Sequence, residues 1–463
     1  MSWNVRSHWR SRIALLALIG CLPLAAPLAT ASKAQTAPTS LQAAFSAAAK
    51  EFGVPESILL SVSYNQSRWE QHGGAPSTTG GYGVMHLVDI GTAPVFDAKG
   101  EDTPRVGQAA ATDPSLHTLD TAAKLLSLSP EALKQDAAQN IRGGAVLLAQ
   151  YARETVNNVP MNEADWYGAV AKYSGSDQAT IALSFADDVY ATIKQGVERT
   201  TTDGQRVRLR GKDVTPNART ADPLNLRTTA TASAADCPSV LMCDYVPAAY
   251  TLNNPADPGD YGNYDPANRE ADGGDIQYIV IHDTETPYDA TIRLFQNPLS
   301  YVSSHYVLRA SDGAITQMVD NRDVAWTAGN WYINAHSINL EHEGYAIEGA
   351  AWYSERMYVA SARLTRYLAD KYNIPLDRAH IVGHDDVPGP TPANQPGMHW
   401  DPGPFWDWGK YMALMDAPIN GAGEATPNVV TINPDWASNK PLVSYCFTRN
   451  DCRDVPRQSA SGA

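Results

Sequence analysis

The last third of the chain constrains the fold most, because short strand-like runs alternate there with helical ones. The segment Ser354–Tyr372 carries its apolar residues on one helical face, and Ser311-Asp312-Gly313 joins two runs as a hairpin. The strand-like runs are 276–281, 305–309, 314–319, 337–343 and 380–382. This alternation predicts an α/β domain over residues 236–418, with a central mixed sheet flanked by helices.

Two histidines and a carboxylate stand at strand ends or in loops of this predicted domain. His282 ends the run Ile279-Val280-Ile281, and His384 lies within Gly383-His384-Asp385. Asp401 belongs to His399-Trp400-Asp401-Pro402-Gly403-Pro404. Such a set can hold a zinc ion that keeps one position open for water, so the sequence points to metal-assisted hydrolysis. His399 shares a face with Asp401 in an extended segment and is an alternative ligand.

Residues 38–198 have a different, mainly helical pattern. Pro55 opens one of the predicted helices, and a glycine-rich loop follows it at 73–83. The predicted helices begin at Leu41 and continue at 56–68, 120–126, 130–155, 163–173 and 178–195. Residues 199–235 are rich in Thr, Arg, Asp and Ala and are predicted to be a linker. The role of the tail, 419–463, cannot be inferred from its composition.

The first 31 residues have the features of a secretory signal. Arg6, Arg10 and Arg12 precede an apolar run, and Ala29-Thr30-Ala31 resembles a cleavage site. Leu18-Ile19-Gly20-Cys21 also fits a lipoprotein cleavage box, although the apolar stretch continues beyond it. No other segment is long and apolar enough to span a bilayer, so we expect a secreted protein without stable membrane insertion.

The net charge limits the classes of binding partner, and the cysteines indicate disulfides. The net charge is −15, which disfavours nucleic acid or an anionic surface held by bulk electrostatics. Beyond the signal, the cysteines form two close pairs, Cys237 with Cys243 and Cys446 with Cys452. Four cysteines permit three pairings, and two local disulfides are the favoured interpretation for an exported chain.

Residues 270–415 resemble the type 2 N-acetylmuramoyl-L-alanine amidases, the group shared by phage amidases and peptidoglycan recognition proteins. Besides the three motifs above, the resemblance rests on Ser304-His305-Tyr306, Ala325-Trp326-Thr327-Ala328-Gly329 and Ile338-Asn339-Leu340-Glu341. It implies that His282, His384 and Asp401 bind Zn²⁺, and that peptidoglycan, with its glycan strand and stem peptide, is the partner.

The resemblance also implies roles for two further residues. Glu341 matches the family's catalytic carboxylate, which moves a proton from water to the leaving amine, and Glu343 is the fallback on the same strand face. His399 stands where many relatives have a lysine and is expected to stabilise the oxyanion. Because histidine is only partly charged near pH 7, we expect activity to respond to pH. His305 is expected to be structural, and Trp326 and Trp400 to be either groove or core.

Residues 38–198 resemble soluble lytic transglycosylases of the lysozyme superfamily. The resemblance rests on Phe52-Gly53-Val54-Pro55-Glu56, Gln66-Ser67-Arg68-Trp69, Tyr82 to Leu87, Asn140 to Gly144, and Val170 to Ser174. Gln66 replaces the family's catalytic glutamate, and an amide cannot protonate a glycosidic oxygen. Glu70 is the nearby substitute. We therefore expect a non-catalytic domain that binds glycan or is only structural.

Together these features predict a secreted, cell-wall-associated, zinc-dependent hydrolase. It would cut the amide between N-acetylmuramic acid and L-alanine in peptidoglycan. The alternative is a protein that binds or recognises peptidoglycan without hydrolysing it, although the three matched ligand positions are all filled.

Overall fold

The computed structural model describes residues 40–93, 96–100, 113–228, 235–269 and 275–419, and the backbone of 442–448 and 451–456. The predicted signal, residues 1–31, lies outside these ranges. Within them, no helix has the length and apolar character that a membrane span requires.

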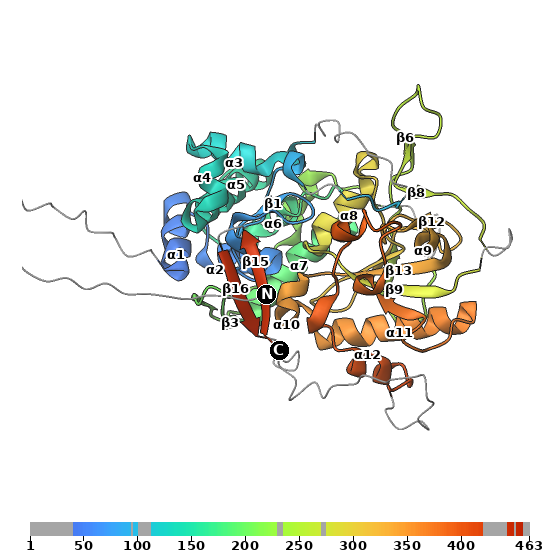
Figure 1. Cartoon of the computed structure of the whole chain (residues 1–463). Helices are drawn as coiled ribbons and strands as arrows, with labels where there is room; N and C mark the ends of the chain where they lie inside the picture. The colour runs from blue at the N-terminus through green and yellow to red at the C-terminus, as the bar shows by residue number, and fades with distance from the viewer. Residues whose placement is uncertain are drawn as a thin grey trace, which may run out of the picture. The chain divides into compact units, whose positions relative to one another are not determined.

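The described residues between 40 and 227 form a helical unit around one hydrophobic core (Figure 1). Its first helix shows how local chemistry sets the bounds: Ser40 accepts a hydrogen bond from the amide of Ala43, and Gly53 ends the helix with φ of 72°. The helices are α1 (Leu41–Phe52), α2 (Glu56–Ser67), α3 (Thr118–Leu126), α4 (Pro130–Gln135), α5 (Ala137–Val156), α6 (Tyr167–Tyr173) and α7 (Ala179–Gln195). Short strand pairs are β1 (Gly81–Tyr82) with β2 (Leu87–Val88) and β3 (Val197–Thr200) with β4 (Arg206–Leu209).

The predicted helix over 130–155 is two helices, α4 and α5. Asp136 separates them in an extended conformation, and its side chain accepts hydrogen bonds from the amides of Ala138 and Gln139. An aspartate that caps the next helix competes with continuation of the preceding one. The apolar periodicity on both sides concealed this break.

The prediction that residues 199–235 form a linker is wrong for most of this segment. β3 and β4 form an antiparallel hairpin, and Val207 and Leu209 of β4 are buried in the core of the helical unit. A 3-10 helix, η5 (Ala218–Leu224), packs against α6. Only alternate residues of these short elements face the core, so the composition remained polar and resembled that of a linker.

The described residues between 236 and 419 contain the predicted central mixed sheet with flanking helices, and this sheet has six strands (Figure 1). The sheet order is β14-β9-β13-β10-β11-β5, and only the β10–β11 pair is antiparallel. Its strands are β5 (Cys243–Tyr245), β9 (Tyr278–Asp283), β10 (Tyr306–Leu308), β11 (Ile315–Gln317), β13 (Ser337–His342) and β14 (Ile381–Gly383). The predicted hairpin at Ser311–Gly313 is the β10–β11 connection.

Helices cover the two faces of this sheet. One face carries Ile279, Ile281, Ile338 and Leu340 and packs on α11, the predicted amphipathic helix, together with α12. The opposite face carries the alternate residues and packs partly on α8. The helices are α8 (Tyr288–Gln296), α9 (Trp331–His336), α10 (Gly349–Trp352), α11 (Glu355–Tyr372) and α12 (Trp408–Leu414). Short pairs β6 (Thr251–Leu252) with β7 (Tyr261–Gly262) and β8 (Tyr264–Asp265) with β12 (Val324–Ala325) complete the unit.

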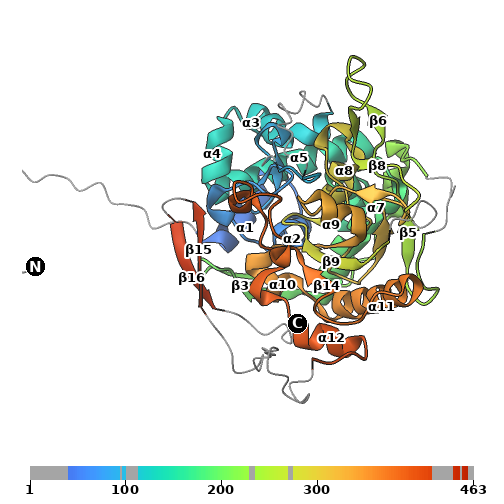
Figure 2. The same cartoon turned by 45° about the vertical axis from the view of Figure 1, so that its right-hand side comes forward.

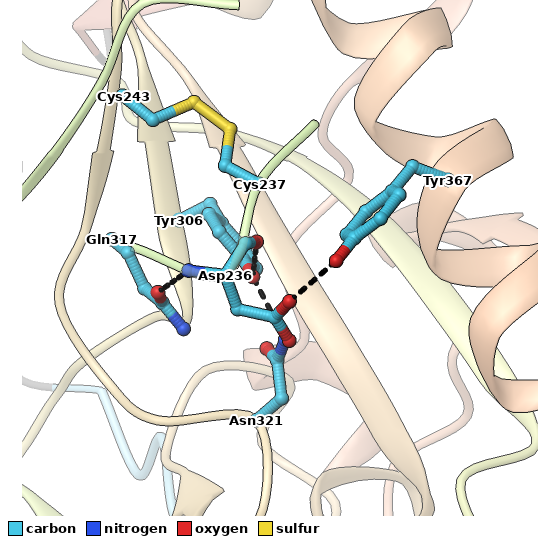
Figure 3. Close-up of a disulfide and its surroundings, with 7 residues drawn as sticks. All are labelled: Asp236, Cys237, Cys243, Tyr306, Gln317, Asn321 and Tyr367. Carbon is cyan, nitrogen blue, oxygen red and sulfur yellow. Dashed lines mark hydrogen bonds between the residues drawn. A yellow bond between two sulfur atoms is a disulfide. The ribbon is translucent and has the colours of Figure 1, made fainter. Parts of the chain in front are cut away.

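A disulfide joins Cys237 to Cys243, which confirms one of the two predicted local pairs (Figure 3). Beside it, Asp236 fixes the start of the α/β unit. Its backbone amide donates to Gln317, and its carboxylate accepts from Tyr367 at 2.8 Å and from Asn321 at 2.8 Å. The other predicted pair lies in the tail, where β15 (Leu442–Thr448) and β16 (Asp451–Pro456) place Cys446 opposite Cys452 in register. That disulfide stays a prediction.

α8 is one of the places where the α/β unit contacts the helical unit, and it lies beside α7 (Figure 2). Gln66, at the end of α2, is 2% exposed, and its amide donates to both carboxylate oxygens of Asp289 at 3.2 and 3.4 Å. One turn further along α8, Arg293 donates to the carbonyl of Ser115. α8 therefore covers the face of the helical unit on which Gln66 stands.

Candidate metal centre and active site

Three adjacent parallel strands bring the candidate residues to one edge of the sheet. His282 lies near the end of β9, its register partner on β13 is Glu341, and His384 directly follows β14. Because parallel strands point the same way, their carboxyl ends form one common edge where sites are usually built. Asp401 comes from a loop, and its carboxylate accepts a hydrogen bond from the amide of Asp283 at 2.9 Å.

The three predicted ligands meet in one buried cage. His282 Nδ1 lies 3.1 Å from His384 Nδ1 and 3.5 Å from Asp401 Oδ2, and His384 Nδ1 lies 3.1 Å from Asp401 Oδ1. All three side chains are almost fully buried. Among the described residues, this is the one group of His, Cys, Asp or Glu whose ligand atoms lie close enough together, within 4.8 Å, to hold a metal ion.

Asn339 determines which nitrogen of His282 faces the cage. Its amide oxygen lies 2.9 Å from His282 Nε2 and accepts a hydrogen bond, so the ring hydrogen resides on Nε2. Nδ1 then presents its lone pair to the cage. This is the outer-shell contact that orients metal-binding histidines. From the sequence, Asn339 was named only as part of a motif and was given no role.

Burial and mutual proximity set the charge states that a metal needs. Burial lowers the pKa of His282, and the neighbouring His384 lowers it further. Burial alone would raise the pKa of Asp401, but the two histidines hold it well below its usual range. Neutral imidazole and ionised carboxylate are the ligand forms of a zinc site, so the donor set fits Zn²⁺.

Glu341 has the environment of a proton-transfer group, whereas Glu343 has not. Glu341 is 8% exposed, its Oε2 is buried without a hydrogen-bond partner, and it lines the same pocket as the three ligands. Burial raises its pKa well above the usual range, and the nearby Asp401 adds to the effect. Glu343 instead accepts hydrogen bonds from the amides of Tyr288 and Ala310, one at each carboxylate oxygen.

His399 borders the cage but is more exposed than the ligands. Its side chain is 37% exposed, and Nδ1 lies 3.7 Å from Asp401 Oδ1. Burial lowers its pKa to about 4, so the ring is neutral at pH 7, unlike the partly charged ring that the sequence suggested. A neutral ring can stabilise negative charge only through its N–H group.

Other predicted positions fall into structural roles. His305 is fully buried and accepts a hydrogen bond from the amide of Asn339, in agreement with its expected structural role. Trp326 is 1% exposed and donates its indole N–H to Asp265, which makes it a core residue. Trp400 lines a second pocket that continues from the cage, and both pockets share Asp401 and His399.

Two residues of the helical unit also line the site and were not predicted. Thr78 borders both pockets, and Phe96 stacks on His399 with ring centroids 3.9 Å apart and planes at 26°. No local pattern marks either residue. Thr78 and Phe96 are each about 200 or more residues away in sequence from the residues that they contact. The periodicity of a single sequence therefore cannot indicate these contacts.

Comparison with known proteins agrees with this geometry. Residues 272–404 match the family model described as N-acetylmuramoyl-L-alanine amidase. The N-acetylmuramoyl-L-alanine amidase A of Achromobacter lyticus is 33% identical over 182 residues, which are 36% of this chain and 93% of that protein. The chain belongs to the N-acetylmuramoyl-L-alanine amidase family.

Two further proteins are similar to part of this chain. The 1,6-anhydro-N-acetylmuramyl-L-alanine amidase AmpD of Salmonella typhimurium is 32% identical over 120 residues, which are 25% of this chain and 57% of that protein. The solved catalytic domain of XlyA is 20% identical, with 38% of this chain and 98% of that chain covered and a TM-score of 0.25.

Proposed function

We propose that this protein is a zinc-dependent hydrolase that cuts the amide between the lactyl group of N-acetylmuramic acid and L-alanine in peptidoglycan. The observation that carries the proposal is the buried cage of His282, His384 and Asp401 at the carboxyl ends of parallel strands, with Glu341 facing the same pocket. Family membership supports the bond that is cut, and the donor set supports zinc.

The three cage residues would hold the ion, which would polarise the scissile carbonyl and lower the pKa of the attacking water. Glu341 would accept the proton of that water at a carboxylate oxygen and deliver it to the leaving amine nitrogen. His399 would donate its N–H to the carbonyl oxygen as negative charge develops there. Asn339 would keep the His282 ring in the tautomer that binds.

The helical unit is proposed to be non-catalytic. The amide of Gln66 cannot act as an acid, and it is buried against Asp289. Glu70, the possible substitute, is also buried, and its carboxylate accepts hydrogen bonds from Thr202 and pairs with Arg199 at 2.8 Å. A lysozyme-like unit of this kind would bind glycan only through a surface other than the one α8 covers.

Export is proposed from the N-terminal signal features. The Cys237–Cys243 disulfide supports it, because structural disulfides persist in oxidising compartments. A secreted, cell-wall-associated location would bring the site to its polymer.

The test is a digest of purified peptidoglycan with the mature protein, with and without a chelator, analysed by mass spectrometry. We expect free stem peptides that begin at L-alanine, their loss with chelator, and their return with zinc. No new anhydro-sugar ends should appear. Intact muropeptides despite bound zinc would reject hydrolysis of this bond and favour recognition without cleavage.

A further inference from the structure

We propose that the helical unit forms one wall of the amidase groove, and that Phe96 is a positioning residue for His399. The proposal rests on the amidase function above and adds a role for a part of the chain outside the amidase domain. Two segments of the helical unit make this wall: 77–79 and 96–100.

Backbone hydrogen bonds fix the segment 96–100 on the amidase domain. The carbonyl of Ala98 accepts from the amide of Gly329 at 3.1 Å and from the side-chain amide of Asn334 at 2.8 Å. Lys99 follows, with Nζ 4.7 Å from the ring centroid of Trp326 and 3.4 Å from the carboxylate of Asp265. These contacts fix the position of segment 96–100 relative to the site.

Gly329 is needed for this docking. Its φ is +60°, and a Cβ at this position would lie 2.6 Å from Cζ of Phe96. Any other side chain would therefore displace the Phe96 ring or strain the backbone. Gly329, the last residue of the motif Ala325–Gly329, is therefore required in this chain by its close approach to Phe96.

The Phe96 ring restricts the His399 ring. It stacks on His399 at 3.9 Å and meets His384 edge-on at 5.9 Å. Without Phe96, a side chain that is 37% exposed would be free to leave the orientation in which Nδ1 faces Asp401. Holding a donor in its reactive orientation avoids an entropic cost during the reaction.

The segment 77–79 restrains the turn that follows the ligand His282. The Thr78 hydroxyl donates to the carbonyl of Thr284 at 2.8 Å, and the hydroxyls of Thr79 and Thr286 lie 2.8 Å apart. Thr78 also lines both pockets that contain Asp401 and His399. A wall-polymer fragment bound at the cage would therefore contact the helical unit.

The first experiment compares full-length Phe96→Ala and Phe96→Tyr with wild type, using release of stem peptides from soluble peptidoglycan fragments. We expect kcat to fall about tenfold in Phe96→Ala, a loss of about 1.4 kcal/mol of transition-state stabilisation, with KM changed less and zinc content unchanged. Phe96→Tyr keeps the ring and should recover most of kcat. Unchanged kcat in Phe96→Ala would overturn the proposal.

Phe52→Ala is the matched control. It also removes a phenylalanine ring from the helical unit, but Phe52 packs against the helical core, away from the residues that line the groove. We expect its kcat to stay near wild type. An equal fall of kcat in Phe52→Ala would mean that general loosening of the helical unit, rather than the Phe96 contact, lowers activity, and would reject the positioning role.

A second readout does not depend on activity. In nuclear magnetic resonance of isotope-labelled histidine, the Phe96 ring should shift the His399 ring protons upfield, and the signal is assigned by its loss in His399→Gln. The shift should persist in Phe96→Tyr and disappear in Phe96→Ala. If wild type releases no stem peptide, the proposed function fails, yet the shift still tests the contact; a resonance unchanged in Phe96→Ala would refute it.

Discussion

Replacing Gln66 by glutamate would place two buried carboxylates against each other. In the structure the Gln66 amide donates to Asp289 at 3.2 and 3.4 Å, and burial already raises the pKa of Asp289. Two ionised groups this close would repel by about 5 kcal/mol at an effective dielectric constant of about 20. Binding one proton costs less free energy than this repulsion, so we expect the pair to share a proton.

The proton gives this prediction its magnitude and its pH dependence. Holding a proton at pH 7 on a carboxyl with an ordinary pKa of about 4.3 costs about 4 kcal/mol, and at pH 5 about 1 kcal/mol. The folded variant keeps the proton while the unfolded variant releases it, so destabilisation by Gln66→Glu grows as pH rises. The shared O–H···O⁻ hydrogen bond replaces the contacts that the Gln66 amide made to the two carboxylate oxygens of Asp289.

Urea unfolding at pH 5 and pH 7 tests this reasoning. The midpoint of Gln66→Glu should fall strongly below wild type at pH 7 and only slightly at pH 5. Adding Asp289→Asn exchanges amide and carboxylate and should restore the midpoint at pH 7. A midpoint deficit independent of pH, or none, would refute the buried pair. We also expect no anhydro-sugar products from Gln66→Glu, because α8 covers this face.

Three further predictions concern the site and its support. Glu341→Gln should lower kcat by about a hundredfold to ten-thousandfold at unchanged zinc content, and full activity in this variant would exclude Glu341 as the proton carrier. Glu343→Gln should instead lower the urea midpoint, because the Glu343 carboxylate accepts hydrogen bonds from two backbone amides. Asp401→Asn should bind zinc more weakly, as measured by metal analysis after dialysis, and wild-type zinc content would remove Asp401 from the ligand set. Burial lowers the pKa of His86 to about 3, so the unfolded chain binds a proton below pH 6.5 that the folded chain excludes. The contribution of His86 to stability should therefore fall by about 1.4 kcal/mol per pH unit as pH drops from 6.5 towards 3. His86→Gln should flatten this slope in urea titrations, and an unchanged slope would assign the acid sensitivity elsewhere.

The sequence was sufficient for the elements that depend on local pattern. The strands that carry His282 and Glu341, and the amphipathic helix α11, follow from periodicity, because one face of each is buried in the same core. The His–His–Asp cage was predicted because the residue types match the chemistry. Periodicity failed at the β3–β4 hairpin, because the two buried residues of β4 form too short a pattern and β3 has none.

The site was predicted only as far as the α/β unit reaches. Phe96 and Thr78 act through contacts with residues far along the chain, and such contacts depend on how the units pack. The charge state of His399 also depends on its burial, which lowers its pKa to about 4, and cannot be predicted from the residue type. Sequence patterns report neither the packing of distant segments nor the local dielectric environment.

The position of α8 has a consequence for the order of folding. Gln66 and Asp289 are 223 residues apart in sequence, so the helical unit emerges first during synthesis and its covered face is complete only after α8 has been made. Closing a loop of this length costs about 5 kcal/mol of chain entropy before any contact compensates for it. The nascent helical unit therefore presents this face to water, and the last step of its maturation belongs to a segment of the amidase domain.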